Sequence, residues 1–288
     1  MNILYRISKN IKNKPNILGC SKHMDAIYVR LIGRMGNNMF QLAAGASLAY
    51  RMGVDCYAYP DPNYWAPEPD KCLLPEYIAK YKHTLFRNFK SIDKLPDSFL
   101  VCQEMDFAYH SLPHEKNMCL SGYFQSERYF HKPLIRELFK IDEHLKDNLI
   151  KRYKTLLAQK PVSINVRRGD YLNVSDHHPV QPLSYFKDAI EIIGTNRHYL
   201  ITSDDPKWCK ENLVGENFHV IEDIAPVENI YLQSLCYDHI ISNSTFSWWG
   251  AWLDNKRNKR VISPKLWFGP KLSHINTKDL IPKAWLAI

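Results

Sequence analysis

The sequence predicts an α/β fold in two halves that face a cleft, each half built on a parallel sheet. The chain has 288 residues, more than the ~100–200 residues of an ordinary single domain. Apolar runs of strand length alternate with stretches of helical periodicity, an order typical of parallel sheets with crossover helices. Polar clusters directly follow several predicted strands, at the edge where doubly wound sheets bind ligands.

The first half opens on a strand, a glycine turn and a helix. Its strands are expected at residues 27–32, 54–58 and 118–124, and its helices at about 38–52 and within 133–159. Five prolines between residues 60 and 75 predict a loop there.

The second half alternates strands with helices more regularly. Its strands are expected at residues 161–166, 198–202, 218–221, 238–242 and 260–263. Its helices are expected at 183–193, 206–212 and 228–235. We therefore predict a flexible leader over 1–24 and two α/β domains over 25–155 and 156–288.

The composition is that of an ordinary globular chain with a basic surplus, with 45% hydrophobic residues, 24% charged residues and a net charge of +8. The Lys and Arg residues are scattered, without the basic stripe and interleaved aromatics of a nucleic-acid-binding protein. The seven Cys include no CxxC pair, which argues against a disulfide framework or a zinc site and fits a reducing cytosol. No apolar run has the length of a membrane helix, so we expect a cytoplasmic protein.

The sharpest polar cluster is Asn165-Val-Arg-Arg-Gly-Asp-Tyr171, after the strand at 161–166. The guanidinium groups of Arg167 and Arg168 suit phosphate oxygens, because a guanidinium forks onto them and stays charged. Gly169 permits a tight turn, and Asp170 can orient an arginine or accept a proton. The alternative is a surface turn held by salt bridges.

A second cluster, Thr202-Ser-Asp-Asp205, ends the strand at 198–202. Asp204 or Asp205 can bind a ribose hydroxyl, the N–H groups of guanine or a divalent metal. Alternatively, one of them caps the helix that starts at Pro206. The two roles are compatible.

The third cluster is Ser242-Asn-Ser-Thr-Phe-Ser-Trp-Trp-Gly-Ala251. Ser244, Thr245 and Phe246 would open an apolar helix whose free N–H groups can bind an anion such as a pyrophosphate. The alternative is plain N-capping, and the tryptophans that follow are expected to be core residues.

A fourth cluster, Gly33-Arg-Met-Gly-Asn-Asn-Met-Phe-Gln41, lies at a strand-to-helix turn of the first half. It matches neither the dinucleotide-binding glycine motif nor the ATPase phosphate loop. Asn37 and Asn38 can donate hydrogen bonds to a phosphate or a sugar.

Taken in their order along the chain, the four clusters resemble the motifs of the α-1,2-fucosyltransferases, glycosyltransferase family 11, of the bacterial type. The family motifs are G-G-x-G-N-Q-x-F-Q, H-x-R-R-G-D-Y, a T-S-D-D-like element and S-N-S-T-F-S-W-W-G-A. The resemblance runs from about Ile27 to Phe268, and the last motif matches nearly residue for residue.

The resemblance implies a GT-B-like fold of two Rossmann-like domains and an inverting transfer of fucose from GDP-fucose without a metal or other cofactor. The domain over 25–155 would hold the acceptor and the domain over 156–288 the donor. By similarity, Arg167 would stabilise the leaving GDP, with Arg168 and Asp170 shaping its loop. The residues implied in donor binding are Asn165, Asn37, Asn38, Asp204, Asp205, Ser244, Thr245 and Phe246.

Two positions depart from the family pattern. The histidine that heads the central motif is Asn165 here, which cannot titrate, so no general-base role can rest on it. Arg34, followed by Met35, replaces the commoner Gly-Leu and adds a charge that can contact the acceptor. Asp170 is the first candidate base. The alternative bases are Asp176, His177 and His178.

The resemblance also implies a galactose-terminated, lipid-linked glycan as the acceptor, joined by an α-1,2 linkage in the synthesis of surface polysaccharide. The basic surface would then contact anionic lipid at the inner face of the cytoplasmic membrane. Alternatives are a transferase for another nucleotide sugar or another hydroxyl, and a non-catalytic nucleotide-sugar-binding protein. A nucleic-acid partner is not expected.

Overall fold

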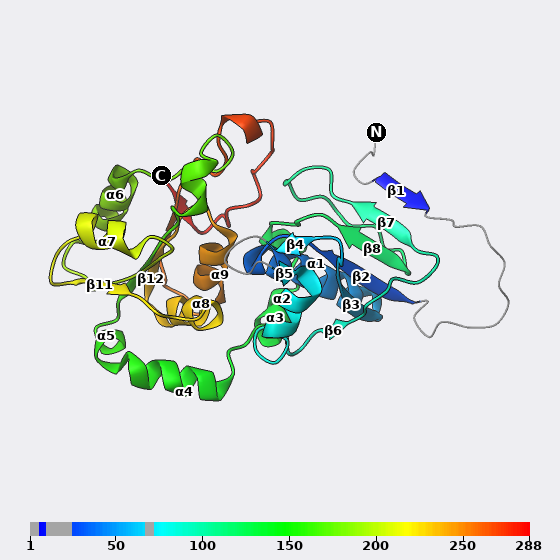
Figure 1. The fold of residues 1–288 in the computed structure, drawn as a ribbon, viewed down its shortest axis with the longest axis horizontal. Coiled ribbons are helices and arrows are strands. Elements are labelled where there is room, and N and C mark those ends of the chain that lie inside the picture. The colour runs from blue at the N-terminus through cyan, green and yellow to red at the C-terminus, as the bar shows by residue number, and fades with distance from the viewer. Residues whose placement is uncertain (1–5, 10–24, 67–71) are drawn as a thin grey trace. The chain divides into compact units, whose positions relative to one another are not determined.

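The computed structural model describes residues 6–9, 25–66 and 72–288 (Figure 1). The chain divides into two compact units. Unit 1 comprises Met1–Phe139 and Lys278–Leu280, and unit 2 comprises Lys140–Thr277 and Ile281–Ile288. Within the described ranges, each unit has its own six-stranded sheet.

The sheet of unit 1 has the strand order β1-β7-β8-β2-β3-β6. The strands are β1 (Arg6–Lys9), β2 (Ala26–Leu31), β3 (Asp55–Pro60), β6 (Lys90–Ser91), β7 (Leu100–Gln103) and β8 (Met118–Ser121). All neighbours pair in parallel except β1, which is antiparallel to β7. Residues 6–9 of the expected leader therefore belong to a strand, and the rest of it, up to residue 24, lies outside the described residues.

The helices of unit 1 are α1 (Met35–Met52), α2 (Leu74–Tyr81), α3 (Lys132–Leu138) and the 3-10 turn η1 (Glu127–Tyr129). Helix α1 is apolar almost all round and largely buried, and it ends at Gly53, whose left-handed φ of 65° favours glycine. The loop expected over 60–75 is only partly correct. A short hairpin of β4 (Trp65–Ala66) and β5 (Cys72–Leu73) and the start of α2 fall within it, because a proline is tolerated in a first helical turn.

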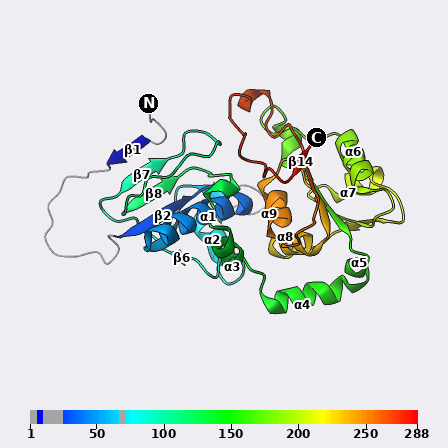
Figure 2. The ribbon, with the colours of Figure 1, turned by 180° about the vertical axis from the view of Figure 1, so that it is seen from behind.

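The sheet of unit 2 is parallel throughout, in the order β11-β10-β9-β12-β13-β14. Its strands are β9 (Val162–Val166), β10 (Tyr199–Ser203), β11 (Phe218–Ile221), β12 (Asp238–Ile240), β13 (Val261–Ser263) and β14 (Leu286–Ala287), the last labelled in Figure 2. Every residue of β9 is buried, as expected of a central strand with helices on both faces.

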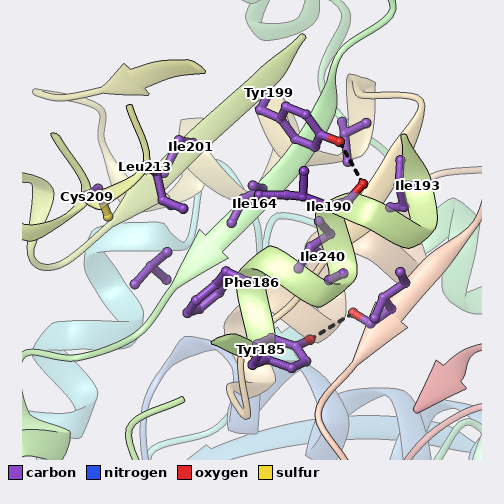
Figure 3. Packing of buried hydrophobic residues seen from close by; sticks show 14 residues of the cluster. Ile164, Tyr185, Phe186, Ile190, Ile193, Tyr199, Ile201, Cys209, Leu213 and Ile240 are labelled. Atoms are coloured by element: carbon purple, nitrogen blue, oxygen red, sulfur yellow. Dashed lines mark hydrogen bonds between the residues drawn. The ribbon is translucent and has the colours of Figure 1, made fainter. Parts of the chain in front are cut away.

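The helices of unit 2 are α4 (Glu143–Arg152), α5 (Lys154–Ala158), α6 (Leu183–Ile193), α7 (Pro206–Asn212), α8 (Pro226–Leu235) and α9 (Thr245–Leu253), with 3-10 turns η2 (Asp170–Asn173) and η3 (Pro270–Leu272). Figure 3 shows α6 packed on the sheet through Tyr185, Phe186 and Ile190. The Tyr185 hydroxyl donates to the carbonyl of Ile241 at 2.6 Å, so this buried phenol is satisfied.

The expected α/β class with two Rossmann-like units is confirmed. The boundary differs from the expected 155/156. Helices α4 and α5 belong to unit 2 because α4 packs near α8, where Arg152 Nη1 lies 3.7 Å from Glu228 Oε2. Residues 278–280 join unit 1 because Asp279 accepts a hydrogen bond from Arg128 at 2.7 Å.

Candidate active site

The candidate active site of unit 2 lies where three neighbouring strands end. β10, β9 and β12 are adjacent and parallel, so the loops that follow them emerge at the same edge of the sheet. These loops carry the clusters at 165–171, 202–205 and 242–251. The structure therefore brings together three clusters that lie far apart in the sequence.

Arg167 is held by two carboxylates. Its Nη1 atom lies 2.7 Å from Asp204 Oδ2, and its Nη2 atom donates to Asp170 Oδ1. Its backbone N–H donates to the hydroxyl of Ser242 at 3.1 Å, which joins the loops after β9 and β12. Since a guanidinium carries five N–H donors in a rigid fork, these contacts orient it and leave further N–H groups for a phosphate.

Arg168 is fixed through both its backbone and its side chain. Its backbone N–H donates to Asp204 Oδ1 at 2.9 Å, and its Nε atom donates to Asp205 Oδ2 at 3.2 Å. Its guanidinium carbon lies 4.3 Å from the ring centroid of Trp208, a cation–π contact. Asp205 Oδ1 also accepts the backbone N–H of Trp208 at 3.1 Å, so Asp205 is the N-cap of α7. This was one of the two roles expected from the sequence.

Gly169 allows the loop after β9 to approach the loop after β10. A Cβ atom at this position would lie 2.5 Å from Asp204 Oδ2, closer than real Cβ contacts. Any other residue would push the carboxylate away from Arg167. The glycine of this motif therefore serves close packing.

Asn165, which replaces the family histidine, is buried within β9. Its Nδ2 atom donates to the Thr202 hydroxyl at 3.0 Å on the neighbouring strand. Its side chain is 6% exposed. The structure therefore places Asn165 as a link between strands beneath the loops, and a direct contact of its amide N–H with the donor is not favoured.

The loop after β12 leads into α9 through Ser244, the N-cap residue. Within the described residues, the Ser244 side chain makes no capping hydrogen bond, and no acidic residue lies in the first helical turn. Thr245 and Phe246 open the helix and are partly exposed. The N–H groups and the dipole of the helix N-terminus therefore give this edge a positive potential that suits an anion.

The tryptophans of this helix belong to the core, as expected. Trp248 and Trp249 are fully buried, and their rings meet edge to face at a centroid distance of 5.2 Å. Trp252 stacks on Trp248 at 6.0 Å. Such aromatic packing anchors α9 and fixes where its N-terminus points.

The candidate bases differ in their surroundings. Asp170 is bound by Arg167. Asp176 is exposed and lies 3.3 Å from the ammonium of Lys271, while His177 is partly exposed and its carbonyl accepts a backbone N–H. His178 stacks on Tyr171 at 5.0 Å, and burial lowers its pKa, an effect that the nearby Asp170 partly offsets. Neutral at pH 7, His178 can accept a proton.

In unit 1, Asn38 has a structural role in the turn between β2 and α1. It is fully buried, and its Nδ2 atom donates to the Ile32 carbonyl at 3.0 Å and to Gln41 Oε1 at 3.2 Å. Gln41 Oε1 accepts the Ile32 N–H at 3.2 Å, and Gln41 Nε2 donates to the Ile32 carbonyl at 3.1 Å. These two amides close the turn between β2 and α1, so a contact of the Asn38 amide N–H groups with a ligand is not favoured.

Asn37 and Arg34 lie on the more open side of the same turn. Both residues are partly exposed, and Asn37 Oδ1 accepts a hydrogen bond from Gln125 Nε2 at 3.1 Å. Arg34 is the N-cap of α1, and its carbonyl accepts the Asn38 N–H at 3.0 Å. A contact of either side chain with a ligand is compatible with this placement.

Neither a metal cluster nor a membrane-spanning helix is found in the described ranges. No group of three or more His, Cys, Asp or Glu side chains there is arranged to hold a metal ion. In the same ranges, no helix has the length and apolar character needed to cross a membrane.

Comparison with known proteins decides the family. The model of glycosyl transferase family 11 matches residues 7–288, nearly the whole chain. The chain belongs to glycosyltransferase family 11.

Three curated relatives of the family 11 chain are informative. An Escherichia coli α-1,2-colitosyltransferase is 27% identical over 92% of this chain and 99% of that protein. The E. coli O-antigen biosynthesis glycosyltransferase WbnK is 33% identical over 58% of this chain and 60% of that protein. The Bos taurus galactoside α-(1,2)-fucosyltransferase 1 is 26% identical over 86% of this chain and 72% of that protein.

Each unit also contains residues that the sequence did not single out. Ser242 bridges the loops after β9 and β12, and the hydroxyl of Tyr171 donates to the carbonyl of Asn243 at 3.1 Å. In unit 1, Gln125 contacts Asn37 and Glu104 accepts two backbone N–H groups. Ser242 and Tyr171 stand inside quoted motifs, which was a usable signal. Nothing in the local sequence marked Glu104 or Gln125.

Proposed function

We propose that this family 11 glycosyltransferase moves L-fucose from GDP-fucose to the 2-hydroxyl of a β-galactoside, with inversion at the anomeric carbon and an α-1,2 linkage. One observation carries the proposal. The guanidinium of Arg167, oriented by Asp204 and Asp170, lies on the same sheet edge as the N-terminus of α9. Such an edge suits the diphosphate of a nucleotide sugar.

The chemistry follows from charge. In the transfer, the bond between the anomeric carbon and a β-phosphate oxygen breaks, and negative charge develops on the departing GDP. Fixed positive groups that face this charge stabilise the transition state more than the ground state. Arg167 and the helix N-terminus supply such groups, so we propose that the reaction needs no metal.

The two aspartates after β10 have distinct roles in this proposal. Asp204 positions both arginines, through the side chain of Arg167 and the backbone of Arg168. Asp205 caps α7 and binds Arg168. Each carboxylate oxygen can accept a second hydrogen bond, so contact between Asp205 and the N–H groups of guanine stays part of the proposal.

A base must take the proton of the attacking hydroxyl. Asp170 is bound to the guanidinium of Arg167, which favours a positioning role. His178 is neutral at pH 7 because burial lowers its pKa, and the charge of Asp170 close by would stabilise the imidazolium that forms. We therefore propose His178 ahead of Asp170 as the base, with Asp176 and His177 as the remaining candidates.

The acceptor is proposed from the relatives and from charge. One relative is named for galactoside fucosylation and another for O-antigen biosynthesis. A galactose-terminated, lipid-linked glycan on the route to surface polysaccharide fits both names. With a net charge of +8, the protein would associate with anionic lipid at the inner face of the cytoplasmic membrane. Pelleting with anionic vesicles at low and high salt tests this, and no salt-sensitive association would contradict it.

The deciding experiment incubates purified protein with GDP-fucose and several β-galactosides in the presence of EDTA. We expect release of GDP together with a product whose new bond is cleaved by an α-1,2-specific fucosidase. Binding of GDP-fucose without transfer to any galactoside would keep the donor and reject the acceptor. No binding of GDP-fucose would reject the proposal.

A second candidate donor is favoured by one observation. The colitosyltransferase relative is matched over 99% of its length. Colitose is fucose without the 3-hydroxyl, so GDP-colitose would present the same diphosphate to Arg167. The two donors are distinguished by their kcat/KM values, measured with GDP-fucose and GDP-colitose in competition. The donor with the higher kcat/KM is the preferred one.

A further inference from the structure

In unit 1, the segment after β8 is bound to the turn that follows β2. Gln41 Nε2 donates to the Gly122 carbonyl at 3.0 Å, and Gln125 Nε2 donates to Asn37 Oδ1 at 3.1 Å. β7, β8 and β2 are parallel neighbours, so these segments meet at the carboxyl edge of the sheet, where α/β folds bind ligands.

The contact between Gln125 and Asn37 fixes the orientation of both amides. With Gln125 Nε2 facing Asn37 Oδ1, the other end of the Gln125 amide is its acceptor oxygen, Oε1. Gln125 is 5% exposed, and its Oε1 atom has no hydrogen-bond partner among the described residues. A buried amide oxygen without a partner is unfavourable, so it is satisfied best by a ligand that donates a hydrogen bond.

The carboxylate of Glu104 holds the turn that places Gln125. It lies directly after β7 and accepts the backbone N–H groups of Tyr123 at 2.5 Å and of Phe124 at 2.8 Å. Gly122 makes room for it, because a Cβ there would lie 2.3 Å from the Glu104 Cβ. Phe124 has a left-handed φ of 52°, a strained conformation for this residue type. Such strain persists only where the surroundings impose it, and it gathers at functional sites.

We propose that Gln125, held against Asn37, accepts a hydrogen bond from a ring hydroxyl of the acceptor sugar, and that Glu104 is the positioning residue for Gln125. The inference rests on the proposed function for the identity of the ligand, a β-galactoside. A sugar hydroxyl can donate a hydrogen bond, so it supplies the partner that the Gln125 oxygen lacks.

The ionisation of Glu104 gives the proposal a distinct signature. Burial raises the pKa of Glu104 to about 7, the two backbone N–H groups oppose this rise, and the negative charge of Asp106 adds to it. Tyr123 and Cys102 are the other titratable groups coupled to it, and no cation among the described residues forms an ion pair with it. As the pH falls through 7, the carboxylate gains a proton and becomes a poorer acceptor for two N–H groups, so the turn loosens.

The test compares Gln125→Leu and Glu104→Gln with Gln103→Leu, an exposed neighbour on β7. Binding of methyl β-galactoside is measured by saturation-transfer NMR without donor, and turnover is measured with GDP-fucose. We expect Gln125→Leu to weaken galactoside binding and raise its KM about tenfold or more, with donor KM and melting temperature unchanged. In wild-type protein, kcat/KM for the acceptor should fall as the pH drops through 7, and Glu104→Gln should lack this limb.

Unchanged galactoside binding in Gln125→Leu would overturn the inference, and so would a wild-type protein that binds no methyl β-galactoside. Galactoside binding that Gln125→Leu abolishes, without fucosyl transfer in the wild-type protein, would support the inference while contradicting the proposed function. If Glu104→Gln fails to fold, the Gln125→Leu comparison still decides, since its side chain is removed without touching the turn.

Discussion

The carboxylate of Asp204 binds two consecutive arginines in different ways. Its Oδ2 atom lies 2.7 Å from Nη1 of Arg167, while its Oδ1 atom accepts the backbone N–H of Arg168 at 2.9 Å. One side chain on the loop after β10 therefore sets both the direction of a guanidinium and the path of the loop after β9. The phosphate-binding geometry that we propose depends on this single carboxylate.

Arg167→Lys should remove the phosphate contact while keeping the charge. A lysine ammonium cannot fork between two carboxylates and a phosphate as the guanidinium does. We expect kcat to fall about 10²–10³-fold, as for loss of a donor that faces transition-state charge. The matched control is Arg152→Lys, because Arg152 is half-exposed and forms an ion pair with Glu228. Near-normal turnover of Arg167→Lys with unchanged melting temperature would show that Arg167 does not bind the leaving group.

Asp204→Asn and Asp170→Asn separate positioning from base catalysis. Asp204→Asn loses charge-assisted hydrogen bonds worth about 1.5–3 kcal/mol each, so kcat/KM should fall at least about tenfold. The Asp170 side chain is 46% exposed, and an exposed ion pair contributes about 0–1 kcal/mol, so Asp170→Asn should cost about fivefold or less. A loss of about 10²–10⁴-fold in Asp170→Asn would instead identify Asp170 as the base.

The sequence allowed good prediction wherever local signals and parallel topology agree. Helices α6 and α7 and strand β11 have the predicted bounds, because apolar periodicity, an Asp N-cap and flanking polar residues mark them. The assembly of the site in unit 2 followed from one rule, that parallel strands end at one edge. The position of Asp205 as an N-cap was also open to prediction from its place before a proline.

Other features depend on contacts that one-dimensional patterns do not contain. Asn37 and Asn38 are adjacent in sequence, yet their side chains have different partners. Asn38 is buried and donates a hydrogen bond to Gln41, whereas Asn37 accepts one from Gln125, which lies in a distant segment. Glu104 has its role because Tyr123 and Phe124 direct their N–H groups at it. The compact units divide at Phe139 rather than at the expected 155/156 for the same reason, since packing near α8 assigns α4 to unit 2.

Ile164→Ala should destabilise unit 2 strongly. Ile164 is fully buried in the central strand β9, within the cluster of Figure 3. Truncation of such a side chain leaves a cavity and costs about 2–5 kcal/mol. Six of the seven tryptophans lie in unit 2, so urea unfolding followed by tryptophan fluorescence reports on it. Ile192→Ala, at a position 46% exposed, is the control and should change the free energy of unfolding by less than about 0.5 kcal/mol.

His239 should make the stability of unit 2 depend on pH. It is buried between Ser163, 2.7 Å from its Nδ1 atom, and Asp254, 3.0 Å from its Nε2 atom. Burial lowers its pKa below the ordinary value of 6.5, although Asp254 opposes this shift. Below about pH 6.5 the unfolded chain therefore binds a proton that the folded chain does not, and the free energy of unfolding falls by up to about 1.4 kcal/mol per pH unit.

The variant His239→Gln tests this linkage because glutamine can still accept from Ser163 and donate to Asp254 without titrating. Urea unfolding between pH 7.5 and 5 should show a flatter pH dependence in His239→Gln than in the wild-type protein. The same substitution at the exposed His144 is the control. His178 and His219 also have lowered pKa values, so part of the wild-type slope should persist. Identical slopes in His239→Gln and wild type would mean that His239 titrates alike in the folded and unfolded chains, with Asp254 fully offsetting burial.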